Sequence, residues 1–369
     1  MGLTPDQERI GRRDEIMRGL EPKVAGKMRI LIDPSKIWQP SDLLPDLTLP
    51  GNDWIEGVVD LRTKASRLSD ASLVTVVGDD VTEEALPTYM SWLNRLSVGD
   101  KTGTQPNAWG QWIRGWTAEE RRHGVVFRDW LMLSGRVDMR QVDRTTQLLI
   151  RNGMDPMIGS DPIMAMVYTS LQEGATDISH RNAGRLALQE GDTILAKIGT
   201  FVGGDEARHK EMYRSIVTWS FEEDPDETML ALGQMLDQGI TMPAALMDDQ
   251  GTFAPGVKKR SPLFEKFSAV AQIAGIYTVG DYVDLVMEQL AYWKVADQTV
   301  FGEAARVQNE VCTKFTPNYR DRLETVIAKR LRSEYGSNPP TFSWIYNRSV
   351  PLNEIKPLEK RKRRSTSAI

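Results

Sequence analysis

Two of the three histidines in this chain follow a glutamate by three positions, a spacing that limits the fold more than any other feature. The pairs are Glu120 with His123 and Glu206 with His209, whereas no glutamate stands three positions before His180. Residues i and i+3 of an α-helix project from nearly the same face, so each pair can direct a carboxylate and an imidazole to one point. One such pair arises often by chance. Two pairs, each within a long helical pattern, predict a metal site built on helices.

Each pair is preceded by a glutamate in another helical segment. Glu83, or its neighbour Glu84, is the first, with 37 positions between Glu83 and Glu120. Glu173 is the second and lies 33 positions before Glu206. A helical bundle that binds two metal ions takes one glutamate from each of two helices and one Glu-x-x-His pair from each of two others. Carboxylates combined with imidazoles favour iron or manganese.

The composition excludes several classes of protein. Cys312 is the only cysteine, which excludes an intrachain disulfide and a thiolate metal cluster. The net charge of −5 argues against nucleic acid as a partner of the whole protein. No apolar stretch approaches the roughly 20 residues that cross a bilayer, and the N-terminus lacks the apolar core of a signal peptide. We expect a soluble protein, in a plastid stroma or a bacterial cytoplasm, with the choice between them open.

Helical spacing of apolar residues recurs over most of the chain and predicts a mainly α-helical bundle. The segments are 72–96, 108–135, 164–187, 193–221, 226–247, 268–295 and 305–335. Pro87 cannot donate a hydrogen bond to the carbonyl of Glu83, so the first of these helices bends or ends there. Thr278 and Asp281 fit a capping box.

The ends of the chain differ from this helical pattern. Residues 1–54 are rich in proline in their second half, and we expect an extended segment that packs on the core. Residues 55–350 are expected to form a single bundle domain, with a short hairpin where aromatic and β-branched residues gather at 341–350. Residues 351–369 end in a basic run and are expected to be disordered.

From about residue 37 to residue 350 the chain resembles the soluble acyl-acyl-carrier-protein desaturases of the plant plastid stearoyl type. The motifs that carry this resemblance include GDDVTEEALPTY, WTAEERRHG, LSGRVDMRQ, NGMDP, DEARH and FSWI. The resemblance implies a ferritin-like bundle with two iron ions per chain. It favours Glu83 over Glu84 and implies as ligands Glu83, Glu120, His123, Glu173, Glu206 and His209.

The resemblance also implies roles for residues around the metals. Thr176 matches a threonine beside the face where oxygen binds, and Asp205 matches an aspartate that supports a ligand. Trp38 matches a tryptophan that links the surface to His123 for electron transfer. A carboxylate such as Asp205 suits this supporting role, because metal-binding histidines usually donate their other N–H to a carboxylate or a carbonyl.

The activity implied by the resemblance is the O2-dependent formation of a cis double bond in an acyl chain on acyl carrier protein. Ferredoxin would supply the electrons, and the protein would be a homodimer. An apolar channel would select the position of the double bond, and the expected lining residues are Leu96, Pro156, Ile158 and Met166. Ile158 and Met166 stand where the stearoyl-type group has a threonine and a phenylalanine, so chain length is left open. Acyl carrier protein is acidic, which makes Lys36 and Arg208 candidate contacts.

Two other classes share parts of this pattern. The small subunit of ribonucleotide reductase has the same order of metal-binding residues. It needs a radical tyrosine one turn after the first histidine, where this chain has Phe127. Ferritin-like iron storage proteins are about half as long and form large cages. The sequence therefore favours the desaturase over both.

Overall fold

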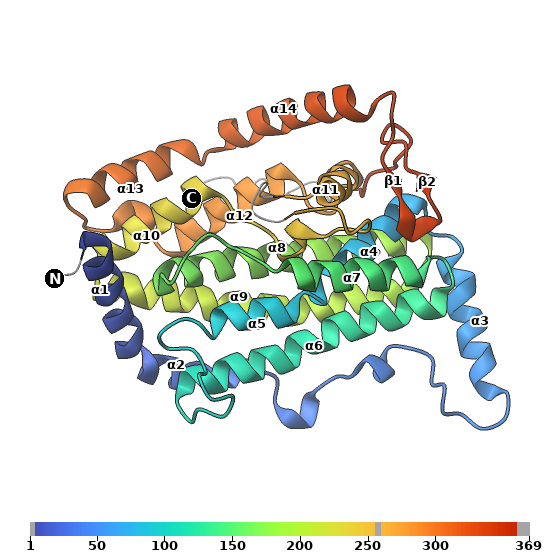
Figure 1. Ribbon diagram of the computed structural model, residues 1–369, viewed down its shortest axis with the longest axis horizontal. Coiled ribbons are helices and arrows are strands. Elements are labelled where there is room, and N and C mark those ends of the chain that lie inside the picture. Colours follow the sequence, from blue (N-terminus) through green and yellow to red (C-terminus); the bar gives the residue numbers. More distant parts are fainter. Residues whose placement is uncertain (1–3, 255–259, 360–369) are drawn as a thin grey trace, which may run out of the picture.

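The computed structural model describes residues 4–254 and 260–359 and consists almost entirely of α-helices (Figure 1). It forms the expected all-α, ferritin-like helical bundle with additional helices. No helix in the described ranges is both long and apolar enough to cross a membrane. The helices are α1 (Pro5–Gly19), α2 (Glu21–Lys27), α3 (Asp53–Ala65), α4 (Asp70–Glu83), α5 (Leu86–Leu93), α6 (Ala108–Ser134), α7 (Met139–Asn152), α8 (Pro162–Glu190), α9 (Thr193–Glu223), α10 (Pro225–Gln238), α11 (Pro262–Ala274), α12 (Val279–Tyr292), α13 (Gly302–Lys314) and α14 (Pro317–Tyr335).

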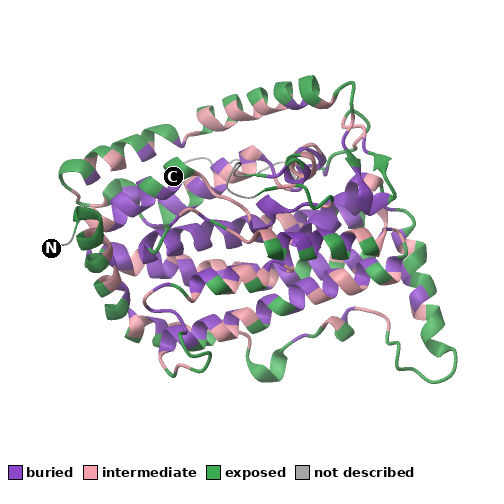
Figure 2. Ribbon diagram, in the orientation of Figure 1, coloured by how far each residue is buried: buried purple, intermediate pink, exposed green. Residues whose placement is uncertain are grey.

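Helices α4, α6, α8 and α9 carry all the residues predicted to bind metal. Figure 2 shows that the buried residues are concentrated along the centre of the bundle, whereas α14 and α3 are largely exposed. Each of the four helices starts with a side chain that accepts a backbone N–H of its first turn: Ser69, Asn107, Asp161 and Asp192. Such caps fix where each helix starts and therefore which residues share its buried face.

Helices α8 and α9 form an antiparallel hairpin and touch closely at two glycines. A Cβ atom at Gly199 would lie 2.4 Å from the backbone oxygen of His180 and 3.0 Å from the Cα atom of Gly184. Only glycine therefore allows this approach. Because α8 and α9 carry three of the predicted ligands, this contact also determines how far apart those ligands stand.

We expect Gly199→Ala to destabilise the protein by about 1–3 kcal/mol, because the added methyl group meets backbone rather than a movable side chain. Denaturant unfolding at equilibrium measures the change. Gly204→Ala is the matched control on the same helix, since nothing lies within 4 Å of the position of its Cβ. That control should be neutral or stabilising by up to about 1 kcal/mol. Equal destabilisation by both substitutions would contradict the role of the close contact.

The N-terminal region differs from its prediction, because residues 5–27 form helices α1 and α2 instead of an extended segment. The expectation of an extended path fits only the stretch that follows, which has short 3-10 turns up to residue 42. Arg13 of α1 is 1% exposed and forms an ion pair with Asp161, the capping residue of α8. Its Nε also donates to Glu227 of α10 at 3.0 Å. Buried ion pairs thus attach α1 to the bundle.

The C-terminal half agrees with most of its predictions. The capping box of Thr278 and Asp281 begins α12, and β1 (Thr341–Phe342) pairs with β2 (Arg348–Ser349) as the expected hairpin. The helix predicted for 226–247 is shorter, because it ends at Gln238. The helix predicted for 305–335 is divided between α13 and α14.

Two further predictions concern helix and chain ends. Pro87 lies in the first turn of α5, so it marks a helix boundary and not a bend within one helix. Residues 351–359 of the predicted tail pack on the bundle, where Leu358 is buried and donates its N–H to the carbonyl of Ala274 at 2.8 Å. Residues 360–369 of that tail lie outside the described residues. The division into one domain with two flanking segments stays a prediction.

Candidate metal centre

The structure brings the six predicted ligand residues together in the centre of the bundle. Two groups each place four ligand atoms within 4.8 Å of one another: Glu83, Glu120, His123 and Glu206, and Glu120, Glu173, Glu206 and His209. All six residues are buried. Glu120 and Glu206 belong to both groups, so they can bridge two ions, whereas each remaining glutamate belongs to one group.

The first group is arranged around Nδ1 of His123. This nitrogen lies 3.6 Å from Oε2 of Glu83, 3.5 Å from Oε2 of Glu120 and 3.4 Å from Oε1 of Glu206. Three carboxylates from three helices therefore face one imidazole. Glu83 rather than Glu84 takes part, as the resemblance implied.

The second group is arranged in the same way around Nδ1 of His209. This nitrogen lies 2.6 Å from Oε1 of Glu120, 3.7 Å from Oε2 of Glu173 and 3.9 Å from Oε2 of Glu206. Each bridging glutamate thus offers one oxygen to each histidine. The two groups together form a pair of adjacent oxygen and nitrogen sites.

The unpaired polar atoms of the cluster fit a pair of bound cations. Within the described part of the chain, these buried ligand atoms have no hydrogen-bond partner: Nδ1 of His123 and His209, Oε1 of Glu120, Oε2 of Glu173 and both carboxylate oxygens of Glu206. Buried polar groups are normally satisfied, so a set of inward-facing lone pairs calls for a ligand. Carboxylates and imidazoles are suitable donors for a first-row divalent metal.

The pKa shifts of the cluster residues also indicate a site for cations. Burial raises the pKa of Glu173 well above its usual value, and the charges of Glu120 and Glu206 raise it further. Burial alone would lower the pKa of His123, but Glu120 and Asp205 raise it well above the usual value. Protons therefore compensate the crowded carboxylates in the absence of metal.

Each metal-facing histidine is supported by an acid on the opposite helix. Nε2 of His123 on α6 lies 3.2 Å from Oδ2 of Asp205 on α9. Nε2 of His209 on α9 lies 3.0 Å from Oε2 of Glu119 on α6. Sequence reasoning identified Asp205 but missed Glu119. The signal was present, because an acid directly precedes the glutamate in both Glu-x-x-His pairs.

Trp38 contacts the cluster through Asp205 and His123, and its role in electron transfer stays a prediction. The indole Nε1 of Trp38 donates to Oδ2 of Asp205 at 3.0 Å, and its ring stacks on that of His123 with centroids 6.3 Å apart. Lys36 is exposed two residues earlier, on the 3-10 turn Pro34–Lys36. A surface segment thus contacts the outer support of the cluster directly.

Arg208 contacts both acids that support the metal-facing histidines. Its guanidinium donates to Oδ1 of Asp205 at 2.7 Å and to Oε2 of Glu119 at 3.0 Å, joining the two supporting acids. Burial opposes the ionisation of Asp205, yet its bonds to His123, Arg122 and Arg208 hold its pKa well below the usual value. Arg208 thus joins the two supporting acids, and because 31% of its side chain is exposed, its contact with acyl carrier protein stays a prediction.

A sequence profile described as fatty acid desaturase matches residues 12–346. The chain belongs to the fatty acid desaturase family. It is 44% identical over 341 residues to stearoyl-acyl-carrier-protein 9-desaturase 5 (chloroplastic) of Oryza sativa subsp. japonica, covering 92% of this chain and 84% of that protein. It is 43% identical over 325 residues to stearoyl-acyl-carrier-protein 9-desaturase (chloroplastic) of Olea europaea, covering 88% and 80% of the two chains. The protein is therefore an oxidoreductase.

A mainly apolar cavity of about 90 Å³ lies beside the candidate ligands of the desaturase. Thr176 and His180 of α8 line one side, and Met242, Phe264 and Tyr277 are among the residues opposite. Thr176 stands one turn beyond Glu173, and its hydroxyl bonds to the carbonyls of Gln172 and Glu173. Sequence reasoning singled out Thr176 but missed the cavity, because its walls come from separate segments.

The four residues predicted to line a channel are all buried. Leu96, Ile158 and Met166 belong to one hydrophobic cluster that also contains Trp116. Trp116 donates its indole N–H to Oε1 of Glu173 at 3.2 Å, so this cluster extends to the metal ligands. A lining role for Leu96, Pro156, Ile158 and Met166 stays a prediction.

Phe127 occupies the position where a radical tyrosine of a ribonucleotide reductase small subunit would stand. Phe127 is fully buried, with its ring centroid 5.2 Å from that of His180, and it offers no phenolic oxygen.

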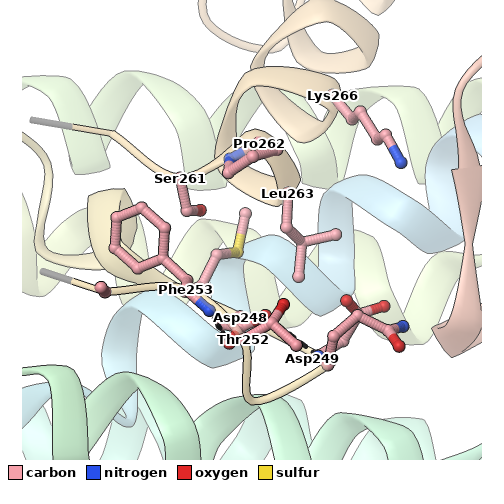
Figure 3. A pocket seen from close by; sticks show the side chains of 11 residues that line it. Asp248, Asp249, Thr252, Phe253, Ser261, Pro262, Leu263 and Lys266 are labelled. Atoms are coloured by element: carbon pink, nitrogen blue, oxygen red, sulfur yellow. Dashed lines mark hydrogen bonds between the residues drawn. The ribbon is translucent and has the colours of Figure 1, made fainter. Parts of the chain in front are cut away.

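A larger hollow, of about 380 Å³, lies between the loop after Met247 and the start of α11 (Figure 3). Its lining residues include none of the candidate ligands, so we assign it no function.

Asp80 lies on α4, one turn before the capping residue Glu84. Its burial predicts that the free energy of unfolding of the protein depends on pH. It is fully buried, and neither carboxylate oxygen has a hydrogen-bond partner among the described residues. Burial, followed by the charge of Glu84, raises its pKa well above the usual value. The folded state therefore binds the proton of Asp80 more tightly than the unfolded state does. The stability that this proton contributes is lost as pH rises from the unfolded-state pKa of about 3.9 towards the higher folded-state pKa.

We expect Asp80→Asn to leave stability unchanged near pH 3.5 and to stabilise the protein increasingly above it. The gain over the parent should approach about 1.4 kcal/mol per pH unit until the folded-state pKa is reached. Urea unfolding of both proteins between pH 3.5 and pH 8 measures the difference. Asp60→Asn on exposed α3 is the control and should change stability by less than about 0.5 kcal/mol at each pH. A constant difference for Asp80→Asn would contradict the prediction.

Proposed function

We propose that this desaturase introduces a cis double bond into a fatty acyl chain carried on acyl carrier protein. It uses two iron ions, O2 and electrons from ferredoxin, and it acts as a homodimer. The observation that carries the proposal is the pair of four-residue groups that share Glu120 and Glu206. The names of the relatives support the substrate class, since two of them are stearoyl-acyl-carrier-protein desaturases.

The six cluster residues would hold the ions with two shared and two unshared carboxylates. Asp205 and Glu119 accept hydrogen bonds from Nε2 of their histidines, which leaves the Nδ1 lone pairs free for metal. When bound, the iron would activate O2, the oxidant of the unactivated C–H bonds, which no protein side chain can do. The protein's part is to fix these donors and to exclude water.

The acyl chain would pass the cluster along α8. Met166, Glu173 and Thr176 follow one another on this helix, whose rise of 1.5 Å per residue puts roughly 10 Å between Met166 and Glu173. The cavity beside Thr176 would admit the chain, and the cluster of Leu96, Ile158 and Met166 would receive its methyl end. Since alkyl chains offer no polar handle, the depth beyond Glu173 would select the bond that is oxidised.

Electrons would enter through the segment that carries Trp38. Its indole is hydrogen-bonded to Asp205, and Asp205 is bonded to His123. Lys36, two residues before Trp38, offers one positive charge to an acidic electron carrier, and Asp33 and Asp42 lie on the same segment. The position of Lys36 therefore supports a contact with ferredoxin more than one with acyl carrier protein.

The deciding experiment combines iron-loaded protein with reduced ferredoxin, O2 and acyl carrier protein thioesters of several chain lengths. We expect about two irons per chain and an unsaturated product two mass units lighter than its substrate, with its double bond located by mass spectrometry. Protein loaded with zinc is the control and should give none. Absence of product at every chain length from fully loaded protein would refute the substrate assignment.

A further inference from the structure

The third histidine, His180, bonds directly to one of the metal-facing glutamates. Its Nε2 lies 2.8 Å from Oε1 of Glu83, and its side chain is 1% exposed. The other oxygen of Glu83, Oε2, is the one that faces Nδ1 of His123. Glu83 is therefore held from outside through one oxygen while it directs the other towards the metal cluster.

His180 is itself fixed from behind by α4 and by its own neighbour. Its Nδ1 lies 3.6 Å from Oδ2 of Asp79, which stands one turn before Glu83. The other oxygen of Asp79 accepts a hydrogen bond from Ser179 at 3.0 Å. The ring of Phe127 packs on the imidazole at 5.2 Å. These contacts direct Nε2 at Glu83, at 2.8 Å, and place it at the longer distance of 3.6 Å from Oε1 of the shared Glu206.

The equivalent glutamate of the second group is held by a different kind of donor. Oε1 of Glu173 accepts from the indole Nε1 of Trp116 at 3.2 Å. The two groups have crossed supporting acids and shared glutamates in common. At the unshared glutamates they differ, with an imidazole backed by Asp79 at Glu83 and an indole at Glu173.

We infer that His180 is a positioning residue that orients Glu83 and makes the two metal positions unequal. The position formed with Glu83 and His123 depends on His180, and the position formed with Glu173 and His209 depends on Trp116. The inference rests on the proposed two-metal centre. Loss of a hydrogen-bond partner behind a ligand typically costs 10–100-fold in metal affinity.

The test uses cobalt(II) on metal-free protein, with binding followed by visible absorption and calorimetry. His209→Ala and His123→Ala backgrounds each leave one position with its full donor set. In the His209→Ala background, His180→Leu should weaken cobalt binding about 10–100-fold. In the His123→Ala background, the same substitution should change it by less than about threefold. Unchanged binding in the second background also shows that the variant folds.

Two matched variants sharpen the test. His180→Gln keeps an N–H donor and should restore most of the affinity lost in His180→Leu. Trp116→Phe should produce the opposite selectivity, weakening binding only where His209 is intact. Equal weakening of both positions by His180→Leu, or none, would overturn the inference while leaving the two-metal centre in place. Failure of the parent chain to bind two cobalt ions would instead refute the centre itself.

Discussion

Glu120→Ala is expected to remove both metal ions and to abolish desaturation. Glu120 lies in both ligand groups, with Oε2 3.5 Å from Nδ1 of His123 and Oε1 2.6 Å from Nδ1 of His209. Its loss deprives each ion of a donor, so affinity should fall by more than the roughly 100-fold that a supporting partner is worth. Metal analysis after reconstitution should find less than one ion per chain, and product formation should fall below detection.

Glu84→Gln is the matched control for this variant. Glu84 neighbours Glu83 in sequence but belongs to neither ligand group. The control should bind two ions and retain product formation. Full metal content in Glu120→Ala would contradict the assigned cluster, and loss of metal in Glu84→Gln would show that the first ligand was misassigned.

Arg13→Met is expected to destabilise the protein by about 3–5 kcal/mol, the largest stability effect we predict. The guanidinium is buried and pairs with Asp161 and Glu227, so its removal leaves Asp161 as an uncompensated buried charge. Asp161 also caps α8 through the N–H groups of Ile163 and Met164. Guanidinium unfolding at constant pH measures the loss.

Arg12→Met provides the comparison from the preceding position. Arg12 also forms an ion pair, with Asp224 at 2.5 Å, but its side chain is 64% exposed. Asp224 is 8% exposed, but solvent around the exposed guanidinium screens the pair, so this variant should lose only about 0–1 kcal/mol. A similar loss for both variants would mean that burial does not decide the strength of these contacts.

The sequence predicted the parts of the centre that depend on spacing along a helix. Glu120 with His123 and Glu206 with His209 meet because i and i+3 share a face. Glu119 stands before Glu120 as Asp205 stands before Glu206, but spacing along α6 does not pair it with His209, which the packing of α6 on α9 brings to it. Arg208 stands three positions after Asp205 on α9, a pair that helical spacing allows, whereas its contact with Glu119 of α6 became visible only in the fold.

Helix α1 shows another limit of pattern reasoning. Its sequence is polar almost throughout, and Arg13 and Met17 are its only buried residues. Apolar periodicity therefore gave no signal, although a capping box at Thr4 marks its start. Ion pairs to α8 and α10 dock this helix, and such pairs between distant segments cannot be found from local spacing.

The charges of the centre balance in two separate sets. Asp205 and Glu119 are paired with the guanidinium of Arg208, and Asp205 also with that of Arg122. The four glutamates of the two ligand groups carry four negative charges, which two divalent ions neutralise. Without those ions, protons must take their place in the buried cluster. Metal uptake should therefore release protons to the solvent and become more favourable as pH rises.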